Sequence, residues 1–251
     1  MITIKTEKQI KEMCAGGKIL ARILNATTQM VKPGVGTVEL DNFVEKEIRV
    51  AGGFPIFKGY HGFPTALCTS INEEVVHAPA KPNRILKEGD IIGLDVGMRY
   101  PAKNGMVVDA ALTVAVGKIS KPAEKLMDTA AEALTMAIKK IKAGKKLGDV
   151  SAAIQTVTEK KGFSVVRDLV GHGVGEKLHE EPQIPNFGLP GTGPVLLAGM
   201  TLALEPMINA GHYGVFEDIK SGTFKTADGL LSAHFEHTVL VTEKGCEILT
   251  K

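Results

Sequence analysis

The 251-residue sequence contains no tryptophan, only three cysteines and almost no net charge. Cys14, Cys68 and Cys246 are far apart and form no C-x-x-C pair, which argues against a zinc ribbon and a disulfide framework. A reducing compartment, the cytoplasm, is therefore expected. The first residues carry charges where a signal peptide needs an apolar run, and no apolar stretch approaches the length of a membrane span.

The pattern of positive charges does not indicate a binding surface for nucleic acid. The formal net charge is +2, and the lysines occur in short clusters such as Lys139-Lys140, without interleaved aromatic residues. Such clusters are typical of solvated helix ends, so neither a nucleic acid nor a membrane is expected as a partner. A hydrophobic content of 44% instead indicates a globular chain with a sizeable core.

Two apolar runs that end in an acid resemble each other. Asp95 ends the run GDIIGLD, and Glu205 ends the run GMTLALE 110 positions later. In each region a further acid, Asp109 or Glu236, precedes another apolar run, and all these runs predict buried strands. Four carboxylates in one core would repel one another and lose their hydration, and divalent cations would remove that cost. The sequence therefore predicts a dinuclear metal site.

His172 is a fifth candidate ligand. It lies between glycines in the run GHGVG, and glycines allow the backbone to turn sharply close to a ligand. An imidazole with four carboxylates suits manganese, iron, cobalt or magnesium better than a sulfur-rich structural zinc site. Two such ions sharing a water molecule lower its pKa from about 16 to about 7, which provides a nucleophile at neutral pH. Taken singly, each acid is more often a loop or cap residue, and only the joint pattern favours metal.

The similarity between the two regions extends to loops and predicted elements. The residues repeated at an offset of 110 or 111 positions are Lys32 and Lys142, Gly34 and Gly144, Gly52 and Gly162, and His61-Gly62 and His172-Gly173. Predicted helices cover 7–31, 37–50 (with Thr37 as N-cap), 120–143 and 149–161. Predicted strands cover 54–57, 65–71, 91–97, 107–116, 164–170, 200–207, 233–242 and 246–250.

Two helices followed by strands thus occur twice in the predicted order. Chance similarity of loop glycines is the alternative, but acids and His-Gly pairs recur at nearly the same offset. We therefore expect one α+β domain over 1–251, built by internal duplication from halves of about 1–117 and 118–251. A functional cleft is expected between the halves.

Short motifs along the chain resemble those of type I methionine aminopeptidases. They are SINE at 70–73, VH at 76–77, DV at 95–96, GHGVG at 171–175, HEEP at 179–182, LEPM at 204–207 and EHTV at 236–239. The similarity covers about residues 5–249. It implies the pita-bread fold, with two pseudo-symmetric halves, an antiparallel sheet core and outer helices. It also implies removal of the initiator methionine from new polypeptides.

The resemblance assigns a metal role to each of the acids and to His172. It implies two divalent ions, cobalt, manganese or iron. Asp95 would bind one ion, Asp109 and Glu236 would bridge the pair, and His172 and Glu205 would complete the second site.

The resemblance also implies three catalytic residues. Glu205 would act as general base and acid, and His179 would stabilise the oxyanion that forms from the scissile carbonyl. His77 would contact the scissile amide nitrogen. On a purely structural interpretation, His77 is a surface loop residue and His179 a partner of Glu180 or Glu181.

An apolar, narrow pocket is implied for the methionine side chain, whose flexible thioether suits such a site. The residues that match the family's pocket are Tyr60, His61, Phe63, Cys68, Leu169 and Leu178. Each of them is otherwise an ordinary core residue. The implied substrates are nascent polypeptides that begin with methionine and a small second residue, handled by a monomer that works at or near the ribosome.

The sequence departs from the family pattern in several places, including Ala78-Pro79 after His77. Asp95 and Asp109 are 14 positions apart, where the family usually has 11, and the extra residues at 99–105 lengthen the hairpin turn. Gly222 occupies a position often held by tryptophan near the pocket. We expect these changes to shift specificity or turnover and to leave the metal chemistry intact.

Three other functions remain open. A prolidase or Xaa-Pro aminopeptidase uses the same ligand types, but usually carries an N-terminal domain for which this length leaves no room. A metal-free pita-bread binding module would lose some ligands, whereas all five candidates are present. A metallophosphoesterase would need basic or histidine-rich phosphate contacts, and none is evident near the ligand motifs.

Overall fold

The structure is a computed structural model that describes residues 2–251. The helices of this part of the chain are α1 (Glu7–Met30), α2 (Thr37–Val50), the 3-10 turn η1 (Tyr60–Gly62), α3 (Lys121–Ile138) and α4 (Leu147–Lys160). Its strands are β1 (Phe54–Pro55), β2 (Cys68–Ile71), β3 (Glu74–Val76), β4 (Ile91–Tyr100), β5 (Met106–Ala115), β6 (Ser164–Val165), β7 (Val170–Gly173), β8 (Glu180–Pro185), β9 (Thr201–Leu204), β10 (Met207–Asn209), β11 (Val215–Asp218), β12 (Thr223–Thr226), β13 (Ser232–His234), β14 (Glu236–Val241) and β15 (Cys246–Ile248).

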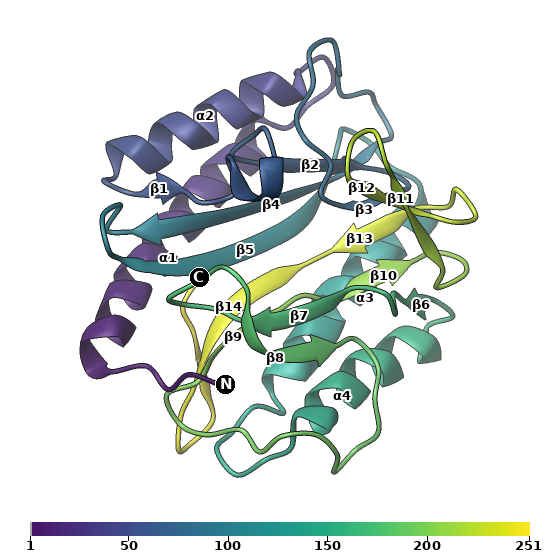
Figure 1. Cartoon of the computed structure of the whole chain (residues 1–251). Helices are drawn as coiled ribbons and strands as arrows, with labels where there is room; N and C mark the ends of the chain where they lie inside the picture. Colours follow the sequence, from purple (N-terminus) through teal and green to yellow (C-terminus); the bar gives the residue numbers. More distant parts are fainter. Residues whose placement is uncertain (1) are drawn as a thin grey trace.

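An antiparallel sheet runs through the middle of the molecule. Its strand order is β1-β4-β5-β14-β9-β7-β8, with β2 paired to β4 and β15 paired to β14. The first-half hairpin β4–β5 therefore meets the second-half pair β14–β9 at the β5–β14 contact, where teal and yellow ribbons lie side by side in Figure 1. Two three-stranded sheets, β13-β10-β6 and β11-β12-β3, flank it.

The helices cover the sheet in two pairs. Helices α1 and α3 pass behind the strands in Figure 1, and each packs beside its neighbour, α2 or α4. The buried apolar side chains form two main clusters: Leu20 and Leu94 belong to the first, and Leu126 and Leu202 to the second. The order of two helices followed by central strands therefore occurs twice, and each helix pair contributes to a different main cluster.

Most helix ends lie within two residues of the prediction, and α2 and α3 show the causes of two departures. The N-cap of α2 is Gly36 instead of Thr37, because Glu39 Oε1 accepts a hydrogen bond from Gly36 N at 2.8 Å. Helix α3 ends at Ile138, several residues early, because the chain beyond it turns to pair with other segments, and Gly144 N donates to Leu196 O at 2.8 Å. In contrast, Ser120 caps α3 as its sequence suggests.

The sequence did not predict the hairpin of β11 and β12. These strands are four residues each, and they complete a sheet only by pairing with β3, more than a hundred positions earlier. Short strands stabilised by such distant partners have weak local signals. Within residues 2–251, no helix combines the length and the apolar character that crossing a bilayer requires.

Candidate metal centre

Strand register places the first-half acids on one face of the sheet. Residues that lie opposite each other in an antiparallel ladder point to the same face, and so do residues two apart along a strand. Asp95 lies opposite Ala111, which is two positions from Asp109. Glu236 also lies opposite Ala111, across the β5–β14 contact. Asp95, Asp109 and Glu236 therefore share this face, and the longer hairpin turn leaves the register of Asp109 intact.

The same rule brings the second-half ligands to this face. Ala203 lies opposite Thr238 on β14 and opposite His172 on β7. Glu205 follows two positions after Ala203, just beyond the end of β9. Ala111 and Ala203 lie between the acids on this face, and their short side chains leave room beside the ligands.

A cavity of about 1010 Å³ lies over this face. Every site residue predicted from the sequence lines it: Tyr60, His61, Phe63, Cys68, His77, Asp95, Asp109, Leu169, His172, Leu178, His179, Glu205 and Glu236. Gly222 also lines the cavity and adopts a φ of 68°, which favours glycine, so a tryptophan there would need a different turn.

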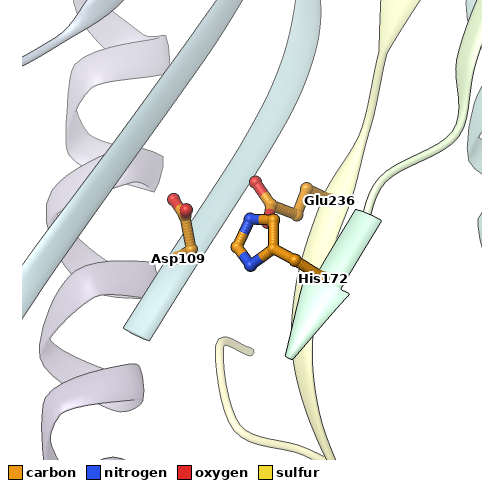
Figure 2. A group of neighbouring side chains, drawn as sticks. All are labelled: Asp109, His172 and Glu236. Carbon is orange, nitrogen blue, oxygen red and sulfur yellow. The ribbon is translucent and has the colours of Figure 1, made fainter. Parts of the chain in front are cut away.

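Three of the predicted ligands form a tight group. One ligand atom each from Asp109, His172 and Glu236 lies within 4.8 Å of the others. Figure 2 shows these side chains reaching from β5, β7 and β14 toward one space. Asp95 and Glu205 lie outside this group but line the same cavity. Both halves of the chain therefore contribute to one polar centre.

His172 presents a lone pair to this centre. Its Nδ1 lies 2.9 Å from Gly173 O, and a carbonyl only accepts, so Nδ1 carries the proton and Nε2 is bare. Nε2 lies 3.4 Å from Glu205 Oε1, which is also an acceptor. Burial, reinforced by His179, lowers the pKa of His172 to about 4, which keeps the ring neutral. Two acceptors that face each other in this way suit a cation between them.

The carboxylates show the same lack of partners. Asp95 Oδ1, Asp109 Oδ1 and Glu236 Oε1 are buried without any hydrogen bond. Burial raises the pKa of Asp109 to about 7, and burial together with Asp109 raises the pKa of Asp95 well above its ordinary value. Unpartnered buried anions are costly, and oxygen-binding cations remove that cost. The donor set therefore fits divalent metal ions.

The burial of Glu205 and Glu236 has a similar effect. Burial and the charges of Asp109 and Asp95 raise the pKa of Glu205 well above its ordinary value. The pKa of Glu236 is raised by burial, Asp109, Glu205 and Asp95, in that order. Each acid therefore holds its proton more tightly until a cation replaces it.

Two histidines stand at the rim of the cavity. His179 Nδ1 lies 3.0 Å from the Tyr60 hydroxyl, and the two rings meet edge to face. His77 adopts a φ of 60° and packs edge-on against Phe224, on the missed hairpin. Both rings are partly exposed toward the cavity, where a substrate can reach them.

Sequence reasoning missed several residues around this centre. His234 is buried, its Nε2 has no hydrogen-bond partner, and that atom lies 3.7 Å from Glu205 Oε2. Its position two residues before Glu236 was the signal that could have found it. Thr3 and Glu180 also line the cavity, and only the tertiary structure shows their role.

Sequence and structure comparisons agree with this geometry. The model of metallopeptidase family M24 matches residues 11–243. A methionine aminopeptidase of Clostridium perfringens is 48% identical over 251 residues, which cover 100% of this chain and 99% of that protein. The crystal structure of the Thermotoga maritima methionine aminopeptidase has 46% identity and a TM-score of 0.97, and the match covers 100% of both chains.

A more distant structure shares only the architecture. The Xaa-Pro dipeptidase of Bacillus anthracis superposes with a TM-score of 0.78 at 24% identity, over 99% of this chain and 62% of that one. The fold and the acid-rich centre are those of a metallopeptidase. This chain belongs to metallopeptidase family M24 and has its pita-bread fold, which confirms the resemblance seen in the sequence.

Proposed function

We propose that this protein removes the N-terminal methionine from polypeptides by metal-dependent hydrolysis of the first peptide bond. The observation that carries the proposal is the set of buried, unpartnered carboxylate oxygens on residues that line the cavity. Its relatives of similar length at 46–48% identity are methionine aminopeptidases. The match at 24% identity supports the fold alone and gives no reason to prefer an Xaa-Pro substrate.

Five side chains hold two divalent ions in this proposal. Asp109 and Glu236, which lie on the same face of the neighbouring strands β5 and β14, would be shared between the ions, while Asp95 would complete one site and His172 with Glu205 the other. Divalent ions at such a centre lower the pKa of a bound water molecule and polarise a carbonyl group. Cobalt, manganese and iron all suit this mixture of oxygen and imidazole ligands.

The protein's own groups move the protons. Glu205 takes a proton from the attacking water and gives it to the departing amine, as its position beyond the end of β9 allows. His179 donates a hydrogen bond to the carbonyl oxygen of the scissile bond. Because the Tyr60 hydroxyl can donate to Nδ1, the Nε2 of His179 keeps the proton for this purpose. His77, which also lines the cavity, contacts the scissile nitrogen.

The rest of the cavity wall binds the side chain of the substrate's first residue and so selects methionine. Tyr60, His61, Phe63, Cys68, Leu169 and Leu178 provide its less polar part. Cys68 lies opposite Asp95 in the β2–β4 ladder, and burial, with the charges of Asp95 and Asp109, raises the pKa of its thiol. It therefore remains a neutral, small wall residue, next to which a thioether can pack.

The substrates, the compartment and the oligomeric state follow from the same proposal. The substrates are nascent chains that begin with methionine and a small residue, and the protein acts on them as a cytoplasmic monomer at or near the ribosome. Three free cysteines support a reducing compartment. We further propose one catalytic domain over 1–251 whose duplicated halves meet near residue 117, supported by the two core clusters.

A peptide assay combined with metal analysis tests the proposal. The purified protein is depleted of metal, reloaded with manganese, cobalt or iron, and given Met-Ala-Ser or an Xaa-Pro peptide. We expect about two ions per chain and release of methionine from Met-Ala-Ser alone. Cleavage of only the Xaa-Pro peptide would assign the protein to the prolidase group, and no cleavage with no bound metal would favour a binding module.

A further inference from the structure

The loop that carries His179 is held by the N-terminal segment of the chain, residues 3–9. His179 lies between β7 and β8, and the residue that follows it, Glu180, begins β8. Glu180 turns its carboxylate back across the loop, so that Oε1 accepts a hydrogen bond from Lys177 N at 2.9 Å. The Glu180 side chain therefore bridges the two ends of the short turn 177–180, which contains His179.

The other oxygen of Glu180 binds the N-terminal segment. Lys5 Nζ lies 2.5 Å from Glu180 Oε2, and Thr3 Oγ1 donates to the same atom at 2.6 Å. The side chains of Lys5 and Glu180 are only 2% and 6% exposed, so solvent does not screen this ion pair. Lys5 N also donates to Gly199 O at 2.9 Å, which fixes its backbone.

Further contacts join the same two segments. Gly175 has a φ of 152°, and a Cβ atom there would overlap Lys5 Cε, so the lysine stem passes directly over its backbone. Gly175 O accepts from Val107 N at 2.6 Å, and Glu176 Oε1 accepts from Gln9 Nε2 at 2.9 Å. The start of the loop, at Gly175 and Glu176, is therefore bound to β5 and α1, and its end, at Glu180, is bound to Lys5.

We propose that Lys5 is a positioning residue for His179: its ion pair with Glu180 holds the 175–180 loop so that the imidazole meets the substrate's scissile carbonyl. This inference rests on the role proposed above for His179. Lys5 touches neither substrate nor metal ligands. Its effect on the reaction passes through Glu180 to the adjacent residue, which Tyr60 holds from the other side.

The test compares Lys5→Met with Lys8→Met. Both replace a lysine of the N-terminal segment, but the Lys8 side chain is 88% exposed and has no contact with the loop. With manganese-loaded protein and Met-Ala-Ser, Lys5→Met should lower kcat about 10- to 100-fold and leave KM unchanged, because misplacing a catalytic group by about 1 Å can cost about 10²-fold. Lys8→Met should keep the wild-type kcat.

A double-mutant cycle separates positioning from general damage. His179→Ala should lower kcat by about 10²–10³-fold. If Lys5 acts through His179, adding Lys5→Met to His179→Ala should cause no further loss. The inference is wrong if folded, metal-loaded Lys5→Met has the wild-type kcat, or if it lowers kcat by the same factor in both backgrounds.

Two further measurements keep the test decisive. Glu180→Gln, which keeps the side-chain shape, breaks the ion pair from the loop side and should repeat the kcat loss if Lys5→Met does not fold; a wild-type kcat would overturn the inference. Amide hydrogen exchange in 175–180 should be faster in Lys5→Met than in Lys8→Met. This exchange is measured without turnover, so it tests the role of Lys5 separately. A wild-type protein that does not cleave Met-Ala-Ser would refute the proposed function. Equal exchange rates in Lys5→Met and Lys8→Met would refute the role of Lys5.

Discussion

The two halves of the molecule hold their acids differently. Asp95 and Asp109 lie inside β4 and β5, two ten-residue strands paired along their whole length. Glu205 lies just beyond the end of the four-residue β9, and Glu236 is the first residue of β14. The first half thus provides short side chains on a rigid ladder, and the second half provides longer side chains at strand ends.

This difference suggests a division of labour between the halves. A carboxylate fixed by neighbours on both sides keeps its geometry, which suits a permanent ligand. A glutamate at a strand end has more torsional freedom and can reach both a ligand and a proton acceptor. We therefore expect Asp95 to serve metal binding alone, and Glu205 to add proton transfer to its metal role.

The largest effect should come from the two acids at which the halves meet. Asp109→Ala or Glu236→Ala removes a ligand that both ions would share in the proposed site, and several kilocalories of stabilisation correspond to roughly 10³-fold or more in rate. Metal content and kcat with Met-Ala-Ser measure this loss. Glu217→Ala, an exposed acid of the same cavity, is the control and should retain both. Near-wild-type rates in either variant would mean that other acids bind the ions.

Smaller effects on kcat and metal content should distinguish Asp95, inside β4, from Glu205, beyond the end of β9. Glu205→Gln keeps an oxygen ligand but cannot accept a proton, so kcat should fall about 10²- to 10⁴-fold while most metal is retained. Asp95→Asn should instead lower metal content, and excess manganese should partly restore its activity. Metal titration followed by kcat measurement compares the two, and equal metal loss in both would remove the proposed division of labour.

The smallest effect concerns the pH dependence of metal binding. The pKa of Asp109 is raised to about 7, so the metal-free protein binds a proton there below pH 7. The pKa of His172 is lowered to about 4, so this ring is already neutral. Because the pKa values of Asp95, Glu205 and Glu236 are raised as well, apparent affinity should rise with pH by about tenfold per pH unit for each proton that the ions displace, and the share of this rise due to Asp109 should end at about pH 7. Calorimetry in buffers of different ionisation enthalpy counts the protons that are released on metal binding.

Glu217→Gln is the matched control for the pH dependence of metal binding. Glu217→Gln changes an exposed carboxyl in the same cavity and should leave the pH dependence as it is. An apparent affinity that stays constant as the pH rises toward 7 would mean that the ions displace no proton from Asp109.

Much of this centre could be predicted from the sequence because its signals are local. Asp95 and Asp109 adjoin apolar runs that form β4 and β5, and the matching offset points to Glu205 and Glu236. The residues missed lack such signals. Lys5 resembles any N-terminal surface lysine, yet it contacts a carboxylate 175 positions away.

The sequence by itself determined which residues bind metal in our proposal and that a two-residue period aligns them on one face of a sheet. Only the tertiary structure decided which oxygens lack partners, which nitrogen of His172 is bare and what holds the loop of His179. The physical reason is range. Hydrogen bonds and buried ion pairs act over about 3 Å, and such distances between remote segments are set only when strands and helices pack together.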